Sequence, residues 1–203
     1  MVQATSDSSF VSSVGINTSI TMISSAYQNY AQMMNALSYI GVTQVRDTYD
    51  NPFTTAEFAQ MNQQLGLKFD FFIALGSAWP GWQIAQIKAN SSIVSYVEGY
   101  NESDSWWQTF NGATGIAATQ AVQQYIYDAV HNDPTLNGVG VIQATFKYPS
   151  SFPAYGDMSA YTDYGSTHTY FGTGNNPIGS EGTIIAQSQT VSPGRPTITT
   201  EAG

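Results

Sequence analysis

Apolar and β-branched residues recur along the chain in seven short runs, and each run predicts a β-strand. The starts of successive runs lie between 24 residues apart (Phe69 to Ile93) and 46 residues apart (Ile93 to Val139). That spacing leaves room for a helix between consecutive strands, whereas a hairpin connection needs only a few residues. The predicted strands are Val14–Ile20, Val42–Asp47, Phe69–Leu75, Ile93–Glu98, Val139–Phe146, Tyr164–Tyr170 and Thr197–Glu201.

The segments between these runs carry helical signals. Between residues 30 and 40 the apolar side chains recur at helical spacing, and Gly41 follows as a stop. Residues 54–57 (Thr-Thr-Ala-Glu) form a capping box that opens a second helix, which Gly66 closes. A later apolar helical face ends before Asp133. Strands that alternate with helices predict a parallel sheet covered by helices.

Such a sheet closes in one of two ways, as an open doubly wound sheet or as a (β/α)₈ barrel. An open sheet usually has a glycine-rich turn after its first strand, and residues 16–21 (Ile-Asn-Thr-Ser-Ile-Thr) contain no glycine. A barrel instead gathers polar residues from its strand ends at the rim that holds its active site. The sequence therefore predicts an α/β fold of the TIM-barrel class. The polar residues at the predicted strand ends are Asn17, Arg46, Asp47, Asn101, Glu102, Gln143, His168 and Glu201.

The seventh run lies at the end of the sequence. A complete barrel of this class has about 250 residues, and the chain has 203. We therefore expect residues 1–203 to form one catalytic barrel domain with about seven βα units, truncated after the seventh strand. The full-length protein is expected to hold further domains or a missing C-terminal segment. Unpaired edges on the first and last strands predict that this chain alone aggregates or forms oligomers.

Composition narrows the range of ligands. Five Lys and Arg against 14 Asp and Glu give a net charge of −9, and the scattered cations exclude an electrostatic nucleic-acid binder. No apolar run approaches the ~20 residues of a membrane span, so no membrane partner is expected. Aromatic residues make up 13% of the chain and charged residues only 9%, which suits a neutral, hydroxyl-rich ligand. This composition also fits a secreted protein, although the first residues lack the features of a signal peptide.

The inventory of reactive side chains is short. The chain has no cysteine, which excludes disulfides, cysteine nucleophiles and thiolate metal sites. The two histidines, His131 and His168, lie far apart in the sequence and offer no zinc set. No G-x-S-x-G motif is present for a serine hydrolase. We therefore expect neither a metal ion nor a cofactor.

Two glutamates at predicted strand ends are candidate catalytic residues. Glu102 follows the fourth strand and Glu201 ends the seventh, and a barrel can bring such rim side chains face to face. A retaining glycoside hydrolase uses two carboxyl groups about 5–5.5 Å apart, one as the acid/base and the other as the nucleophile. A single exposed glutamate is more often a solvated surface residue, so the neighbouring residues decide between the two interpretations.

Four short motifs in these positions resemble clan A glycoside hydrolases, which are retaining (β/α)₈ enzymes with catalytic glutamates on strands four and seven. Residues 98–102 (Glu-Gly-Tyr-Asn-Glu) resemble the Asn-Glu motif of strand four, and residues 200–203 (Thr-Glu-Ala-Gly) resemble the nucleophile motif of strand seven. Residues 168–170 (His-Thr-Tyr) resemble the His-x-Tyr of strand six, and residues 45–47 (Val-Arg-Asp) resemble the strand-two arginine.

The resemblance implies roles in a double displacement. Glu102 corresponds to the acid/base and Glu201 to the nucleophile. Arg46 would keep Glu201 ionised, and Tyr170 would donate a hydrogen bond to it. The substrate that the resemblance and the composition together imply is a neutral β-linked oligo- or polysaccharide.

Further residues are implied in substrate binding. By the resemblance, Asn101 hydrogen-bonds the sugar 2-hydroxyl, and His168 contacts the substrate or orients the acid/base. Trp79 follows the third predicted strand, and Trp106 and Trp107 follow the fourth, in predicted rim loops. Indole rings stack on the apolar face of pyranose rings, so we assign Trp79 and Trp106 to sugar subsites. The alternative is that these indoles anchor long loops by packing.

Structural alternatives stay open for the charged residues. Arg46 pairs with Asp47 or Asp50 as a structural ion pair, or with Glu98, which we leave out of the catalytic set. His168 is alternatively a buried structural histidine. The rival function is a non-catalytic carbohydrate-binding or structural barrel of a larger exported protein.

Overall fold

The computed structural model describes residues 6–22, 27, 29–50, 55–76, 79–170 and 177–202. Within them, strands alternate with helices from one end of the chain to the other. The strands are β1 (Gly15–Asn17), β2 (Gln44–Asp47), β3 (Lys68–Ile73), β4 (Val94–Tyr100), β5 (Thr109–Phe110), β6 (Ala113–Thr114), β7 (Gly140–Ile142), β8 (Gly165–Thr169) and β9 (Thr197–Ala202). The helices are α1 (Asp7–Ser12), α2 (Tyr30–Ile40), α3 (Thr55–Leu65), α4 (Trp79–Ala89), α5 (Ile116–His131), α6 (Phe152–Tyr155) and α7 (Pro177–Val191).

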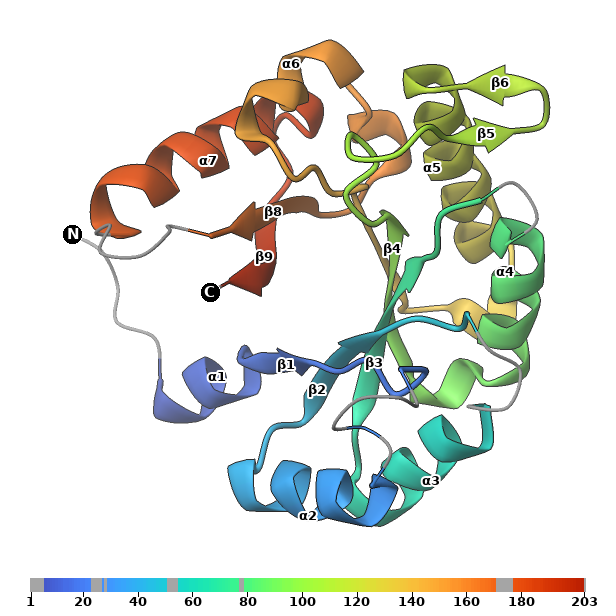
Figure 1. Ribbon diagram of the computed structural model, residues 1–203, viewed down its shortest axis with the longest axis vertical. Helices are drawn as coiled ribbons and strands as arrows, with labels where there is room; N and C mark the ends of the chain where they lie inside the picture. Colours follow the sequence, from blue (N-terminus) through green and yellow to red (C-terminus); the bar gives the residue numbers. More distant parts are fainter. Residues whose placement is uncertain are drawn as a thin grey trace.

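Seven of the strands form a parallel, curved array in chain order. The order β1-β2-β3-β4-β7 makes one sheet, and β8 pairs with β9 in another. A parallel bridge between Ile142 and Tyr164 connects β7 to the segment that enters β8. The longer helices lie outside this array (Figure 1). The fold is a partial (β/α)₈ barrel, and each of the seven predicted strands is present.

Predicted helices are present, and they bury the apolar faces from which they were predicted. In α2, Met33, Met34 and Leu37 are buried, and Gly41 ends the helix with φ of 74°, in the left-handed region that favours glycine. The helix over 55–65 is also present, while Thr54 of the predicted capping box lies outside the described residues. Tertiary burial of these faces, rather than propensity, stabilises helices of this length.

Aromatic rings pack between α3 and β3. Phe58 of α3 meets Phe69 and Phe71 of β3 edge-on, with ring centroids 5.2 and 5.0 Å apart, and all three are fully buried. Burying each such ring stabilises the fold by about 1.5–3 kcal/mol. This packing holds α3 against β3.

Close packing also explains one glycine of the 98–102 motif. A Cβ at Gly99 would lie 2.3 Å from Oε1 of Gln123 and 2.6 Å from the backbone nitrogen of Ala144. Only glycine fits this approach between β4, the segment after β7 and α5.

Two local features differ from the sequence prediction. Trp79 was expected in a rim loop but begins α4, where it packs edge-on against Trp82 at 5.7 Å. Pro80 permits this because a proline in the first turn gives up no intrahelical hydrogen bond. The hairpin β5–β6 was not predicted, although Asn111 and Gly112, both with positive φ, are the residue pair that a tight hairpin turn favours.

The ends of the array face each other across a seam. Among the described residues, β1 pairs only with β2, and β9 pairs only with β8. At the rim, Nδ2 of Asn17 donates to the backbone oxygen of Thr200 at 3.0 Å, so one side chain links the two edge strands. None of the described helices is long and apolar enough to cross a membrane.

Asp47 does not pair with Arg46, contrary to one structural alternative. Its carboxylate accepts hydrogen bonds from the Thr18 hydroxyl and from the backbone N–H groups of Ile20 and Thr48. Burial nevertheless raises the pKa of Asp47 to about 6, because these hydrogen bonds offset only part of the desolvation cost.

This buried carboxyl predicts a pH dependence of stability. Asp47 ionises near pH 3.9 in the unfolded chain and near 6 in the folded protein, so the folded state binds more protons between these values. Stability from this group is therefore lost as pH rises through that window, by about 3 kcal/mol in total. Urea unfolding between about pH 4 and pH 7 measures it.

The Asp47→Asn variant is the matched control, because it removes the titrating group while keeping the shape of the side chain. Its unfolding free energy should depend on pH less steeply than that of the wild type, whatever its absolute stability. Equal slopes for the two proteins would exclude Asp47 as the source.

Candidate active site

The backbone at Glu102 has an unusual conformation that aims its side chain. β4 ends at Tyr100, so Glu102 lies in the turn that follows, with φ of 45°. A non-glycine residue in this region carries strain, which the surroundings must offset. Thr145 does so from the segment after β7: its Oγ1 accepts from the Glu102 N–H at 2.9 Å, and its carbonyl accepts from Ser103 N–H at 3.0 Å.

Glu201 lies inside β9 and is paired with His168 of β8. A register shift between Thr167 and His168 interrupts the ladder at this point. Such irregularities re-aim side chains next to active sites. Here the bulge brings the imidazole and the carboxylate together at the rim.

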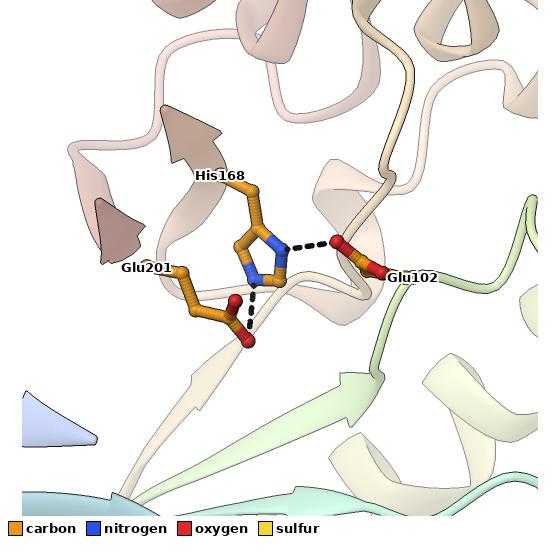
Figure 2. A group of neighbouring side chains, drawn as sticks. All are labelled: Glu102, His168 and Glu201. Carbon is orange, nitrogen blue, oxygen red and sulfur yellow. Dashed lines mark hydrogen bonds and ion pairs between the residues drawn. The ribbon is translucent and has the colours of Figure 1, made fainter. Parts of the chain in front are cut away.

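His168 lies between the two glutamates, as Figure 2 shows. Its Nδ1 is 3.2 Å from Oε1 of Glu102, and its Nε2 is 3.6 Å from Oε1 of Glu201. The imidazole is almost fully buried. One oxygen of each glutamate and one ring nitrogen all lie within 4.8 Å of one another. Facing oxygens of the two carboxylates thus lie within 4.8 Å of each other, an approach that favours the shorter separation of retaining enzymes, about 5–5.5 Å, over the longer one of inverting enzymes.

Arg46 connects this cluster to the interior of the barrel through all five donors of its guanidinium group. Nε and Nη2 donate to the two oxygens of Glu98 at 2.8 and 2.5 Å, and Nη2 also donates to Oδ1 of Asn101 at 2.7 Å. Nη1 donates to Oε1 of Glu201 at 2.7 Å and to Oδ1 of Asn17 at 3.3 Å. Of the alternatives that the sequence left open for Arg46, the pair with Glu98 is present, and Glu98 is fully buried.

The environment keeps Glu201 ionised. Burial by itself would raise the pKa of Glu201, but His168, the Tyr170 hydrogen bond and Arg46 together lower it below its ordinary value. Tyr170 donates its hydroxyl to Oε2 of Glu201 at 2.6 Å, the contact that the resemblance implied. That hydrogen bond, with burial, raises the pKa of Tyr170 to about 12, so it stays a donor over the physiological range.

Glu102, His168 and Glu201 are of residue types that bind metal ions. The hydrogen bonds that Glu201 already makes, however, do not suit a metal site. Both oxygens of Glu201 already accept hydrogen bonds, from Arg46 and Tyr170. A cation bound there would meet the guanidinium charge 2.7 Å from the same oxygen. The cluster therefore suits a pair of carboxylates better than a divalent ion.

Asn101 is oriented by its neighbours. Its Oδ1 accepts from Nη2 of Arg46, which sets the amide with its nitrogen as the remaining donor. Thr145 Oγ1 lies 3.5 Å from the same oxygen. Sequence reasoning did not identify Thr145 or the bridging role of Asn17, because neither carries a motif.

The three tryptophans assigned or considered for sugar subsites lie outside the cluster. Trp106 and Trp107 are 68% and 77% exposed between β4 and β5. Trp107 packs beside Gly115, whose added Cβ would lie 3.6 Å from the indole ring. Trp79 is half-buried at the start of α4. Their roles in binding stay predictions.

Comparisons with known proteins support the fold. No family model matches the sequence, and no curated protein matches it either. Among solved structures, a calcium-binding mutant of Bacteroides uniformis β-glucuronidase 2 is similar at a TM-score of 0.56 and 14% identity, over 88% of this chain and 23% of that chain. A putative deoxyribose-phosphate aldolase from Coccidioides immitis is similar at a TM-score of 0.56 and 12% identity, over 97% of this chain and 74% of that chain.

At these identities the likenesses concern architecture alone. Both agree with the partial (β/α)₈ barrel formed by the strands and helices of this chain. The chain spans about a quarter of the length of the β-glucuronidase that it matches.

Proposed function

We propose that this barrel is a retaining glycoside hydrolase of clan A type. The observation that carries the proposal is the pair of closely facing carboxylates in unequal surroundings. Glu201 is held as an anion by Arg46 and Tyr170, while Glu102 faces it across His168. A short separation between two carboxyl groups is the arrangement that double displacement requires.

The reaction has two steps. Glu201 attacks the anomeric carbon while Glu102 gives its proton to the glycosidic oxygen, so the C–O bond breaks and a glycosyl ester forms on Glu201. Glu102, now a carboxylate, then takes a proton from water, which attacks the same carbon and releases Glu201. Nδ1 of His168 lies 3.2 Å from Oε1 of Glu102, where it can orient the acid/base.

Several features support a neutral sugar as substrate. The Asn101 amide nitrogen is the donor left for a sugar 2-hydroxyl once Arg46 has engaged its oxygen. Exposed Trp106 offers an indole face on the loop that follows Glu102. The few cations and many uncharged polar side chains of the chain also suit a β-linked oligo- or polysaccharide, and secretion fits such a substrate.

One structural neighbour is named a β-glucuronidase and the other a putative aldolase, so the fold favours an enzyme without choosing the reaction. Aldol chemistry through a Schiff base needs a lysine at the site. None of the three lysines pairs with the described Glu102, His168 or Glu201: Lys68 donates to the Ser92 carbonyl, Lys88 pairs with Asp133, and Lys147 lies over the Tyr148 ring. The carboxylate pair therefore favours glycoside hydrolysis.

A mechanism-based label tests the proposal. Activated aryl 2-deoxy-2-fluoro-β-glycosides of several sugar types should inactivate the protein with time. The fluorine slows both oxocarbenium-like steps, whereas the good aryl leaving group speeds only the first, so the glycosyl ester accumulates. Peptide mass spectrometry should then place the added mass on Glu201. Sugar binding without labelling by any member of the panel would replace the hydrolase with the non-catalytic carbohydrate-binding barrel.

A further inference from the structure

A buried carboxylate lies directly behind the candidate active site. Glu98 is fully buried on β4, and both of its oxygens accept hydrogen bonds from Arg46. The opposite nitrogen of the same guanidinium group, Nη1, faces Glu201. One cation therefore lies between two carboxylates, one inside the barrel and one at its rim.

A second acid, Asp70, lies beside this pair, and the charge of Arg46 by itself would lower the pKa of Asp70. Burial, and then the negative charge of Glu98, raise the pKa of Asp70 well above its ordinary value, which favours its neutral form. Its Oδ1 is buried without a hydrogen-bond partner. The two carboxylates that accept hydrogen bonds from Arg46 are Glu98, through both of its oxygens, and Glu201.

We propose that Glu98 is a positioning residue for the nucleophile. By binding Nε and Nη2 it fixes the plane of the guanidinium group so that Nη1 faces Glu201. It also takes up part of the positive charge that Glu201 would otherwise receive alone. The guanidinium group has five donors in one plane, so it can bind both carboxylates at once in a fixed geometry. The ammonium group of a lysine cannot do this.

The division has a consequence for reactivity. A carboxylate that receives the full charge of a buried arginine is strongly stabilised as an anion, and a more stabilised anion is a weaker nucleophile. With Glu98 present, Glu201 stays ionised yet retains basicity. The catalytic meaning rests on the proposed function, whereas the electrostatic connection between Glu98, Arg46 and Glu201 does not.

The other groups that face Glu201 come from neighbouring elements. They are His168 on β8, Tyr170 just after β8 and Glu102 after β4. None of them contacts Glu98 among the described residues. Replacing Glu98 therefore changes the charge behind Arg46 while leaving these three side chains in place.

The test is a titration of Glu201 by ¹³C NMR of glutamate side-chain carboxyl carbons, with Glu201→Gln used to assign the signal. Glu98→Gln is made in an Asp70→Asn background, so that Asp70 cannot ionise beside Arg46 once the charge of Glu98 is gone. Relative to Asp70→Asn alone, the pKa of Glu201 should then fall by about one unit, because a like charge is lost and Arg46 has one carboxylate fewer to neutralise. Glu98→Asp in the same background keeps the charge and should bring the value back toward that of Asp70→Asn alone. An unchanged or raised pKa in the Glu98→Gln protein overturns the proposal.

A measurement on the wild type covers the case in which Glu98→Gln does not fold. The Nε of Arg46 is hydrogen-bonded to Glu98 and not to Glu201. If the charge is shared, its ¹⁵N signal should shift with the same midpoint as the Glu201 carboxyl carbon. A ¹⁵N signal that does not shift at the midpoint of Glu201 would show that Glu98 and Glu201 do not share the charge of Arg46.

Neither titration needs a substrate, so the two proposals fail separately. Absence of labelling at Glu201 removes the hydrolase and leaves the electrostatic result standing. Where turnover is found, the acidic limb of the kcat/KM profile of Glu98→Gln, in the Asp70→Asn background, should move to lower pH by the same amount as the Glu201 titration. An acidic limb that stays in place would contradict the role of Glu98 in the reaction.

Discussion

Glu201→Gln should abolish hydrolysis of every glycoside that the protein turns over. The amide is uncharged and cannot attack the anomeric carbon, so no glycosyl ester forms. Removing a covalent nucleophile lowers kcat by about 10⁴-fold or more. Initial rates on a panel of aryl β-glycosides, with circular dichroism to confirm folding, measure the effect.

Glu181→Gln is the matched control for this prediction. It makes the same chemical change at an exposed position in α7. Its rates should equal those of the wild type. A Glu201→Gln protein whose rates stay within about tenfold of the wild type would exclude Glu201 as the nucleophile.

Glu102→Ala should lose activity selectively, according to the leaving group. Substrates with poor leaving groups need the proton that Glu102 supplies, and we expect losses of about 10²–10⁴-fold for them. Aryl glycosides with good leaving groups should still form the glycosyl ester, which then accumulates because no group activates water. A burst of released phenol followed by slow turnover is the expected kinetic signature.

Azide provides a second test of the same residue. The anion can enter the space that the carboxyl group leaves, and it attacks the glycosyl ester without general-base help. The product should be a glycosyl azide with the anomeric configuration of the substrate, because two displacements have occurred. An inverted azide, or equal losses for good and poor leaving groups, would contradict the assignment of Glu102 as acid/base.

The strands were predictable because their signal is local. A parallel strand buried on both faces needs a run of apolar residues, and a helical connection sets the spacing between runs. The structure shortens some of them: β1 spans Gly15–Asn17 and β7 spans Gly140–Ile142. Ladder length depends on the neighbouring strands, which a local pattern does not describe.

The partner of Arg46 depended on strand geometry. Arg46 and Asp47 are adjacent on β2, so their side chains point to opposite faces. Asp47 is consequently bonded to Thr18 and Ile20, while Arg46 reaches Glu98 and Glu201. Alternation along the strand was enough to reject the Arg46–Asp47 pair, but only the folded barrel could bring β4 and β9 to the same guanidinium group.

The sequence by itself determined the barrel class, the chain positions of the strands and which polar side chains end them, because periodicity and spacing act over a few residues. The tertiary structure alone decided the backbone of Glu102, which Thr145 holds from 43 positions further along the chain. It also decided that Trp79 begins a helix and that Asn17 bridges the seam to Thr200. The Thr145–Glu102 and Asn17–Thr200 contacts join residues distant in sequence, and such contacts form only when the chain closes around its core.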